Sequence, residues 1–189
     1  ETLVPDPSSV VTVETSVVSE TRVSYDGGWA HLTTRRWADA SHAEIEWTVG
    51  PVPVDERRRV GSEIVVRYAA GLATRGAWAT DANGRDMRTR ERDRREDWTL
   101  NVTEPVAGNY YPCTSVVAAE DASAGMHVVL DRSQGAASLR DGEIETMVHR
   151  RVLRDDGLGV GEALNETRCG CRRCECEGLI ARGTHLLGV

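Results

Sequence analysis

The stretch "HAEIEWTVG", residues 42–50, decides the fold class, because its apolar and polar side chains alternate without interruption. The apolar set is Ala43, Ile45, Trp47 and Val49. The polar set that alternates with it is His42, Glu44, Glu46 and Thr48. A two-residue period is typical of a β-strand that buries one face. The stretch therefore predicts a half-buried antiparallel strand with Trp47 in the core.

Other segments show the same character. Short runs rich in β-branched residues, bounded by Gly, Asp, Ser or Pro, occur at 10–18, 63–68, 114–119 and 126–130. Residues 143–153 fit a strand or a helix by pattern, and the preceding Asp141-Gly142 turn favours a strand. Asn83-Gly84 is a strong hairpin signal. With no capped amphipathic helix in view, the sequence predicts an all-β fold, an antiparallel β-sandwich.

Composition limits the partners. The chain has 189 residues, 40% hydrophobic and 28% charged, which suits a soluble domain or part of a larger protein. No segment approaches the roughly 20 consecutive apolar residues of a membrane span, so no membrane partner is expected. The net charge of −7 argues against nucleic acid as a partner. We expect residues 1–9 to be the ragged end of an element that continues upstream, and residues 10–189 to form the β-sandwich.

Two clusters have more than one interpretation. The run "RDMRTRERDRRED" (85–97) interleaves Arg with acids, which favours a solvated or structural face over a phosphate site. Four thiols lie close together in an insertion at 167–177: Cys169, Cys171, Cys174 and Cys176. Zinc sites usually use two Cys pairs separated by a loop. The thiols are therefore only weak metal candidates, beside a reactive or disulfide-bonded loop or an insertion without function.

The remaining polar residues complete no catalytic set. The five His are scattered and show no paired metal-ligand spacing. Glu44 and Glu46 share the exposed side of one strand, so solvation explains them better than glycoside hydrolysis. Asn101 and Asn165 begin N-x-T sequons, which are glycosylation sites if the chain is secretory. From the residues alone, the function is open.

Several longer motifs resemble one family. The segments "TEPVAGNYYP" (103–112) and "DRSQGAASLRDGEIETMVHRRVLRDDGLGVGE" (131–162) resemble the C-terminal β region of lysosomal-type α-mannosidases, glycoside hydrolase family 38. "EIEWTVGPVPV" (44–54) and residues 80–106 fit the same region in the same order, and "RGTHLL" (182–187) continues it. The resemblance implies β domains of sandwich type, similar to the galactose-mutarotase super-sandwich, within a large multidomain enzyme. Tyr110 and Tyr111 are expected to pack beneath neighbouring strands.

The resemblance also implies a function. The family is that of retaining, zinc-dependent exo-glycosidases that remove terminal α-mannose from glycans. Its zinc ligands and nucleophile lie upstream, in a catalytic domain that would be this region's partner, so no catalytic residue is expected here. The expected compartment is the lysosome, the vacuole or the secretory pathway. The alternative is a non-catalytic β-sandwich module that binds carbohydrate or another partner.

One loop carries the expected substrate contacts. In the family, a D-D-x-R-G-x-G segment reaches the active-site rim, and backbone at its Arg-Gly step contacts the sugar. The matching residues here are Asp155, Asp156, Leu158 and Gly159. Leu158 replaces the Arg, so a backbone contact survives but a guanidinium contact does not. A plain β-turn shaped by Asp and Gly is the other interpretation.

Overall fold

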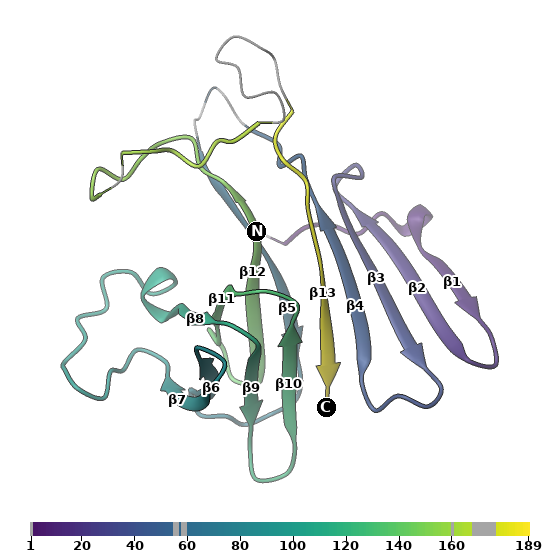
Figure 1. The fold of residues 1–189 in the computed structure, drawn as a ribbon, viewed down its shortest axis with the longest axis horizontal. Coiled ribbons are helices and arrows are strands. Elements are labelled where there is room, and N and C mark those ends of the chain that lie inside the picture. Colours follow the sequence, from purple (N-terminus) through teal and green to yellow (C-terminus); the bar gives the residue numbers. More distant parts are fainter. Residues whose placement is uncertain (1, 55–56, 58–59, 160, 168–176) are drawn as a thin grey trace.

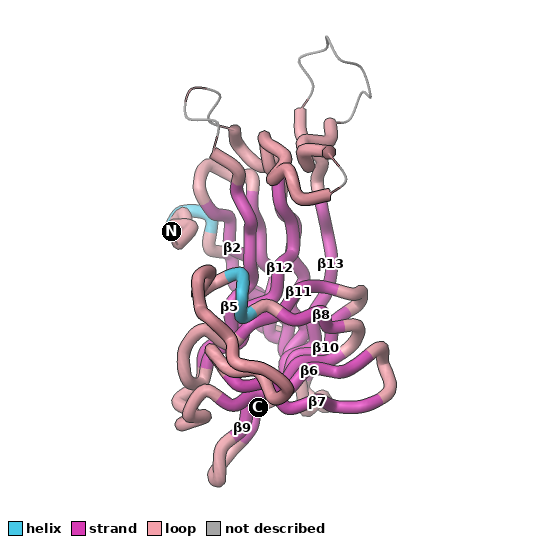
Figure 2. Tube along the Cα trace, turned by 90° about the vertical axis from the view of Figure 1, so that its left-hand side faces the viewer, coloured by secondary structure: helices cyan, strands magenta, loops and turns pink. Residues whose placement is uncertain are grey.

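The computed structural model describes residues 2–54, 57, 60–159, 161–167 and 177–189. Within these residues the chain forms two antiparallel sheets and two short 3-10 turns, η1 (Pro7–Ser9) and η2 (Ala107–Asn109) (Figures 1 and 2). The prediction of an all-β antiparallel sandwich is confirmed. No helix in this part of the chain has the length and apolar character needed to cross a membrane.

The larger sheet has nine strands. In spatial order they are β1 (Val11–Glu14), β2 (Val18–Tyr25), β3 (Ala30–Trp37), β4 (Ala43–Val49), β13 (Ala181–Gly188), β10 (Gly125–Leu130), β9 (Val116–Glu120), β6 (Ala77–Ala82) and β7 (Asp86–Glu91). The smaller sheet has four, in the order β5 (Ser62–Ala69), β12 (Glu143–Arg151), β11 (Gln134–Ala137) and β8 (Tyr111–Cys113). The last strand, β13, therefore pairs with β4 and β10 in the middle of the larger sheet.

The core lies between the two sheets. Strand β4 confirms its predicted alternation, since Ile45, Trp47 and Val49 are buried while Glu46 is exposed. Strands β9, β10 and β12 supply much of the remaining buried apolar surface, including Val117, Val128 and Ile144. Burial of apolar side chains on one face of each strand is what holds the two layers together.

Strand β13 depends on a glycine for close packing. A Cβ atom at Gly183 would lie 2.3 Å from Cζ2 of Trp47, so only glycine leaves room for the indole on the neighbouring strand. His185, two residues later on the same face, is fully buried. A polar residue and a glycine thus occupy core positions of β13, and this hides the strand from a search for apolar alternation.

One turn was missed in the sequence prediction and another is present as predicted. Residues 10–18, predicted as one strand, form β1 and the start of β2, joined by a turn. Thr15 makes this turn: its Oγ1 accepts hydrogen bonds from the N–H groups of Val17 and Val18. The hairpin predicted at Asn83-Gly84 is present between β6 and β7, with both residues at positive φ.

Gly142 fixes the entry to β12. Its φ is +70°, and a Cβ atom there would lie 2.2 Å from the carbonyl oxygen of Ala70. Glycine is therefore required at this turn on both conformational and steric grounds. The strand that follows runs from Glu143 to Arg151, which confirms the strand interpretation of residues 143–153.

Candidate functional site

The predicted substrate-contact loop follows β12 at one end of the sandwich. In Figure 1 it projects away from the sheets at the upper left of the view. Asp155, Asp156, Leu158 and Gly159 are all exposed, and the Leu158 side chain is 89% accessible. The structure therefore places the four predicted residues together on one accessible loop.

The loop is shaped by its own aspartates. Asp155 Oδ1 accepts a hydrogen bond from Gly157 N at 2.8 Å, and Asp156 Oδ1 accepts one from Leu158 N at 2.9 Å. These are consecutive Asx turns, in which the side chain replaces a backbone acceptor. Gly157 has φ +75°, a conformation that favours glycine, whereas Gly159 does not lie in that region. The carbonyl groups at Leu158 and Gly159 accept none of the hydrogen bonds observed in the described chain.

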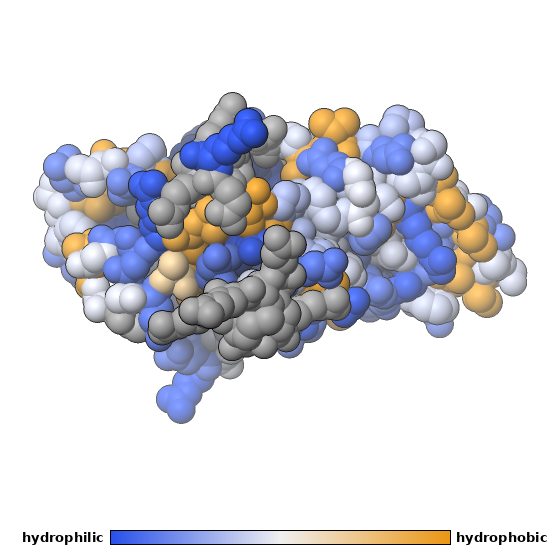
Figure 3. Space-filling model, turned by 90° about the horizontal axis from the view of Figure 1, so that it is seen from above, coloured by the Kyte–Doolittle hydropathy of each residue, from blue (hydrophilic) through white to orange (hydrophobic). Residues whose placement is uncertain are grey.

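A hollow lies beneath this loop. It has a volume of about 550 Å³ and is lined by the loop, by the end of β12 and by the start of β5. Glu63 and Arg150 face each other across neighbouring strands here, with Arg150 Nη1 3.6 Å from Glu63 Oε1. This end also exposes Val60 and Leu179, and the view from above shows hydrophobic surface between hydrophilic side chains (Figure 3). The surface at this end therefore combines apolar and charged groups.

Arg151 joins neighbouring segments at this end of the sandwich. Its Nη1 donates to the carbonyl oxygen of Val52 at 3.1 Å, and its Nε donates to Asn165 Oδ1 at 2.6 Å. His149 Nε2 lies 3.0 Å from the carbonyl oxygen of Leu179. The last residues of β12 therefore bind both the segment after β4 and the segment before β13.

The two sequons are accessible. Asn101 and Asn165 are exposed, and the contact from Arg151 is made to Oδ1 of Asn165. The four weak metal candidates, Cys169, Cys171, Cys174 and Cys176, lie outside the described residues. Among the described residues, no three His, Cys, Asp or Glu side chains converge as metal ligands.

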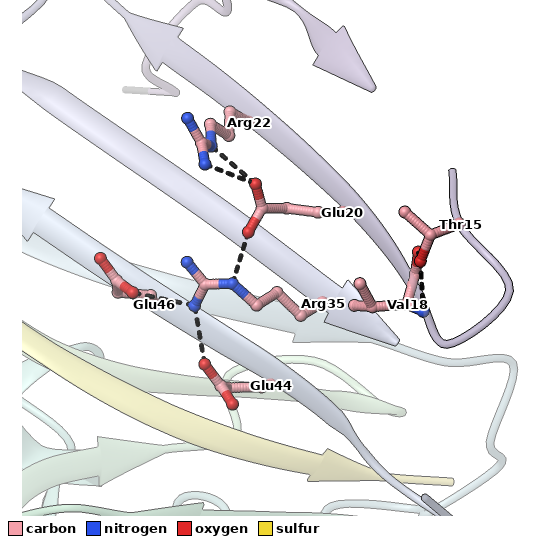
Figure 4. Close-up of polar contacts among 7 residues, drawn as sticks. All are labelled: Thr15, Val18, Glu20, Arg22, Arg35, Glu44 and Glu46. Atoms are coloured by element: carbon pink, nitrogen blue, oxygen red, sulfur yellow. Dashed lines mark hydrogen bonds and ion pairs between the residues drawn. The ribbon is translucent and has the colours of Figure 1, made fainter. Parts of the chain in front are cut away.

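Glu44 and Glu46 lie in an ion-paired cluster on the outer face of the larger sheet (Figure 4). Arg35 Nη1 is 2.7 Å from Glu44 Oε1 and 2.9 Å from Glu46 Oε2, and Arg35 Nε is 2.5 Å from Glu20 Oε2. The carboxylates of Glu46 and Glu20 raise the pKa of Arg35. Because one guanidinium binds all three acids, we interpret this cluster as structural: it joins β2, β3 and β4 on their outer face.

Asp81 is a buried acid with a structural role. Asp81 Oδ1 accepts hydrogen bonds from the N–H groups of Thr114, Ser115 and Val116 at 2.8–3.0 Å. Burial opposes ionisation, but these backbone donors outweigh it and lower the pKa of Asp81. Burial, reinforced by Asp81, raises the pKa of Cys113 to about 12, so this thiol is unreactive.

Tyr110 and Tyr111 anchor the "NYYP" segment as predicted. Both are half-buried. The hydroxyl of Tyr110 donates to Glu145 Oε1 at 2.5 Å, and the ring of Tyr111 meets Trp78 edge-on with centroids 5.7 Å apart. These contacts join β8 to strands of both sheets.

The fold is that of an antiparallel β-sandwich domain with an exposed loop at one end. The chain matches the glycosyl hydrolases family 38 C-terminal domain over residues 1–158, and it belongs to that family. It is 48% identical over 161 residues to an alpha-mannosidase of Canavalia ensiformis, covering 85% of this chain. It is 46% identical to the lysosomal alpha-mannosidase of Bos taurus and 43% identical to that of Homo sapiens, each over 175 residues and 93% of the chain. The chain spans about 16% of the length of each of these relatives.

Proposed function

We propose that this chain is the C-terminal β domain of a zinc-dependent, retaining α-mannosidase that releases terminal α-mannose from N-glycans and other oligosaccharides. The observation that carries the proposal is the family match over residues 1–158, together with 43–48% identity to proteins named alpha-mannosidase. In this proposal, residues 10–189 are the sandwich domain, and residues 167–177 are a Cys-rich insertion in it. The partner is an upstream catalytic domain of the same polypeptide.

In this proposal the domain helps to position the substrate and takes no part in breaking the glycosidic bond. A retaining glycosidase needs a nucleophile and an acid/base carboxylate about 5 Å apart. Among the acids described here, those of the Arg35 cluster are paired with arginine and Asp81 is engaged by backbone N–H groups, which suits structural roles rather than bond breaking. The nucleophile, the acid/base and the zinc ligands are therefore assigned to the catalytic domain. When bound there, zinc supplies electrostatic stabilisation of substrate oxygens.

The contribution of this chain is the loop after β12. With Leu158 in place of the family's Arg, the polar groups offered to a sugar are the backbone carbonyls at Leu158 and Gly159 and the carboxylates of Asp155 and Asp156. The two Asx turns hold this backbone in one conformation before substrate arrives, which reduces the ordering cost of binding. The compartment we propose is the lysosome, the vacuole or the secretory pathway, supported by the names of the relatives and by the two exposed sequons.

Expression of the complete reading frame tests the proposal. The full polypeptide should hydrolyse a chromogenic α-mannoside at acidic pH, lose activity to a zinc chelator and regain it with added zinc. The 189-residue chain alone should show no turnover under the same conditions. A full-length product that is inactive on every α-mannoside, or turnover by the isolated chain that disappears in Asp155→Asn, would contradict the assignment.

A further inference from the structure

A second hollow lies at the β7 edge of the larger sheet, between β7 and the loop that follows it. It has a volume of about 390 Å³. Its lining includes two arginines and two aromatic residues: Arg90 on β7, Arg95 and Trp98 on the loop, and Tyr111 on β8. The hollow shares no lining residue with the one beneath the Asp155–Gly159 loop.

Two guanidinium groups are held rigidly on one side of this hollow. The Cζ atoms of Arg90 and Arg95 lie 4.2 Å and 4.7 Å from the centroid of the Tyr111 ring. Arg90 Nε donates to Thr80 Oγ1 at 3.0 Å, and Arg95 donates to the carbonyl oxygens of Arg94 and Gly108. Neither makes an ion pair with a carboxylate in the described chain. A guanidinium carries five N–H donors, so both retain donors for a ligand.

Trp98 provides an open apolar surface beside these donors. Its side chain is 59% exposed, and within the described residues it has no ring or cation partner. The ring of Tyr111 is already in contact with Trp78 and with the two arginines. Of the two aromatic side chains that line the hollow, Trp98 is therefore the one whose ring is open to a ligand. Glu96 and Asp97, immediately before it, also line the hollow and make no hydrogen bond or ion pair in the described chain.

The mixture of groups selects the class of ligand. A phosphate or another oxyanion would gain from Arg90 and Arg95 but would face the carboxylates of Glu96 and Asp97. An uncharged polyol uses both kinds of group, because each hydroxyl both donates and accepts hydrogen bonds. A pyranose ring also has an apolar C–H face that matches a flat aromatic side chain. We propose that this hollow is a sugar-binding subsite in which one pyranose ring stacks on Trp98 and its hydroxyls bind Arg90, Arg95 and the adjacent carboxylates.

A second exposed tryptophan provides a natural comparison. Trp37, 41% exposed, lines a larger hollow of about 580 Å³ at the hairpin ends of β1 to β4. Arg36 and His42 line that hollow, but their side chains make no hydrogen bond or ion pair in the described chain. Arg90 and Arg95, by contrast, are fixed before a ligand binds, and preorganised groups bind at a lower entropic cost. The structure therefore favours Trp98 over Trp37.

Titration of the 189-residue chain with a linear α-linked mannotriose tests the subsite. The inference rests on the proposed function only for the choice of mannose as the first sugar. Cellotriose is the second probe, and inorganic phosphate is the third. Saturation-transfer NMR and calorimetry should show a saturable trisaccharide site with a dissociation constant of about 1 mM. Trp98→Ala should weaken binding at least about tenfold, whereas Trp37→Ala should leave it unchanged.

Removing the two carboxylate charges distinguishes a sugar-binding site from an anion-binding site. In the double variant Glu96→Gln/Asp97→Asn, sugar binding should stay the same or weaken, because two acceptors change, while phosphate binding at an anion site would strengthen. The subsite is refuted if neither trisaccharide binds, if Trp37→Ala removes the binding, or if phosphate alone binds in a Trp98-dependent way. Because the readout is binding to the isolated chain, its failure is distinct from a failure of the full polypeptide to hydrolyse α-mannosides.

Discussion

The hydroxyl of Tyr68, on the smaller sheet, lies 2.7 Å from Nδ1 of His185, on the larger sheet. This bond crosses the core and joins the two layers. The indole N–H of Trp47 donates to the other ring nitrogen of His185 at 3.2 Å. The same nitrogen also lies 2.9 Å from Oε1 of Gln134, and burial keeps the imidazole neutral by lowering its pKa. A charged imidazole would lose this arrangement.

Stability should therefore fall as the solution is acidified through the range in which unfolded His185 takes up a proton. Burial lowers the pKa of His185 to about 4 from 6.5, with Asp131 opposing and Arg132 reinforcing the effect. A depressed pKa on a base means that the unfolded chain binds more protons between these values, so stability is full above about pH 6.5 and declines down to about pH 4. We expect a loss of about 2 kcal/mol between pH 7 and pH 5.

Urea unfolding at half-unit pH steps measures this loss, and His185→Gln is the control. Asp81, Asp131 and Asp141 have lowered pKa values relative to 3.8. Their stabilising contributions are lost only at lower pH, so the range from pH 5 to pH 7 isolates His185. The variant should lose most of the slope in this range. An unchanged slope would show that His185 does not control it.

Asp81→Asn should destabilise the fold by about 3 kcal/mol, because the ionised carboxylate receives four backbone N–H groups in a nearly dry site. An amide nitrogen in the same place would face these donors. Asp86→Asn, at an exposed position on β7, is the matched control and should change stability by less than about 0.5 kcal/mol. Equal effects of the two variants, measured by urea denaturation, would contradict the role of Asp81.

Gly183→Ala should cost about 2–3 kcal/mol, since the new methyl group would lie 2.3 Å from the Trp47 ring and force the indole or the strand to move. The tryptophan emission spectrum should change together with the melting temperature. Gly71→Ala is the comparison: an added Cβ there meets nothing within 4 Å, so stability should be unchanged or slightly higher.

A strand could be predicted from the sequence where its own residues alternate between apolar and polar. Strand β4 was predictable because its buried face is wholly apolar. The division of residues 10–18 was not, since a threonine side chain rather than Gly or Pro makes the turn. Strand β13 was hidden by Gly183 and His185 on its core face, whose partners Trp47 and Tyr68 are distant in sequence.

The candidate sites also differ in how far the sequence predicts them. The clustering of Asp155, Asp156, Leu158 and Gly159 follows from their adjacency in the chain, whereas their contact with a sugar stays a prediction. The run at 85–97 was expected to be a solvated or structural face. Arg92 and Arg94 do pair with Asp141 and Glu91. Arg90 and Arg95 instead stack on Tyr111, and no local pattern could indicate this because the ring comes from another strand.

The rim loop offers a test that separates backbone strain from substrate contact in the full-length enzyme. Gly157 has φ +75°, so Gly157→Val should distort the loop whether or not sugar binds there. Gly159 is different: it does not have a left-handed conformation, and an added Cβ meets nothing within 4 Å. Gly159→Val should therefore leave the melting temperature unchanged, and any kinetic effect of this variant reports on a contact outside the chain.

We expect Gly159→Val to raise KM for an α-mannoside by about tenfold, equivalent to roughly 1.4 kcal/mol of lost binding, with a smaller change in kcat. The reason is that a branched side chain would stand between the backbone carbonyls and the sugar. Leu158→Ala is the matched control, because the leucine side chain is 89% exposed and its removal leaves the backbone in place. Its KM should stay within about twofold of the parent value. A wild-type KM in Gly159→Val would show that the Asp155–Gly159 loop is a turn without a role in substrate binding.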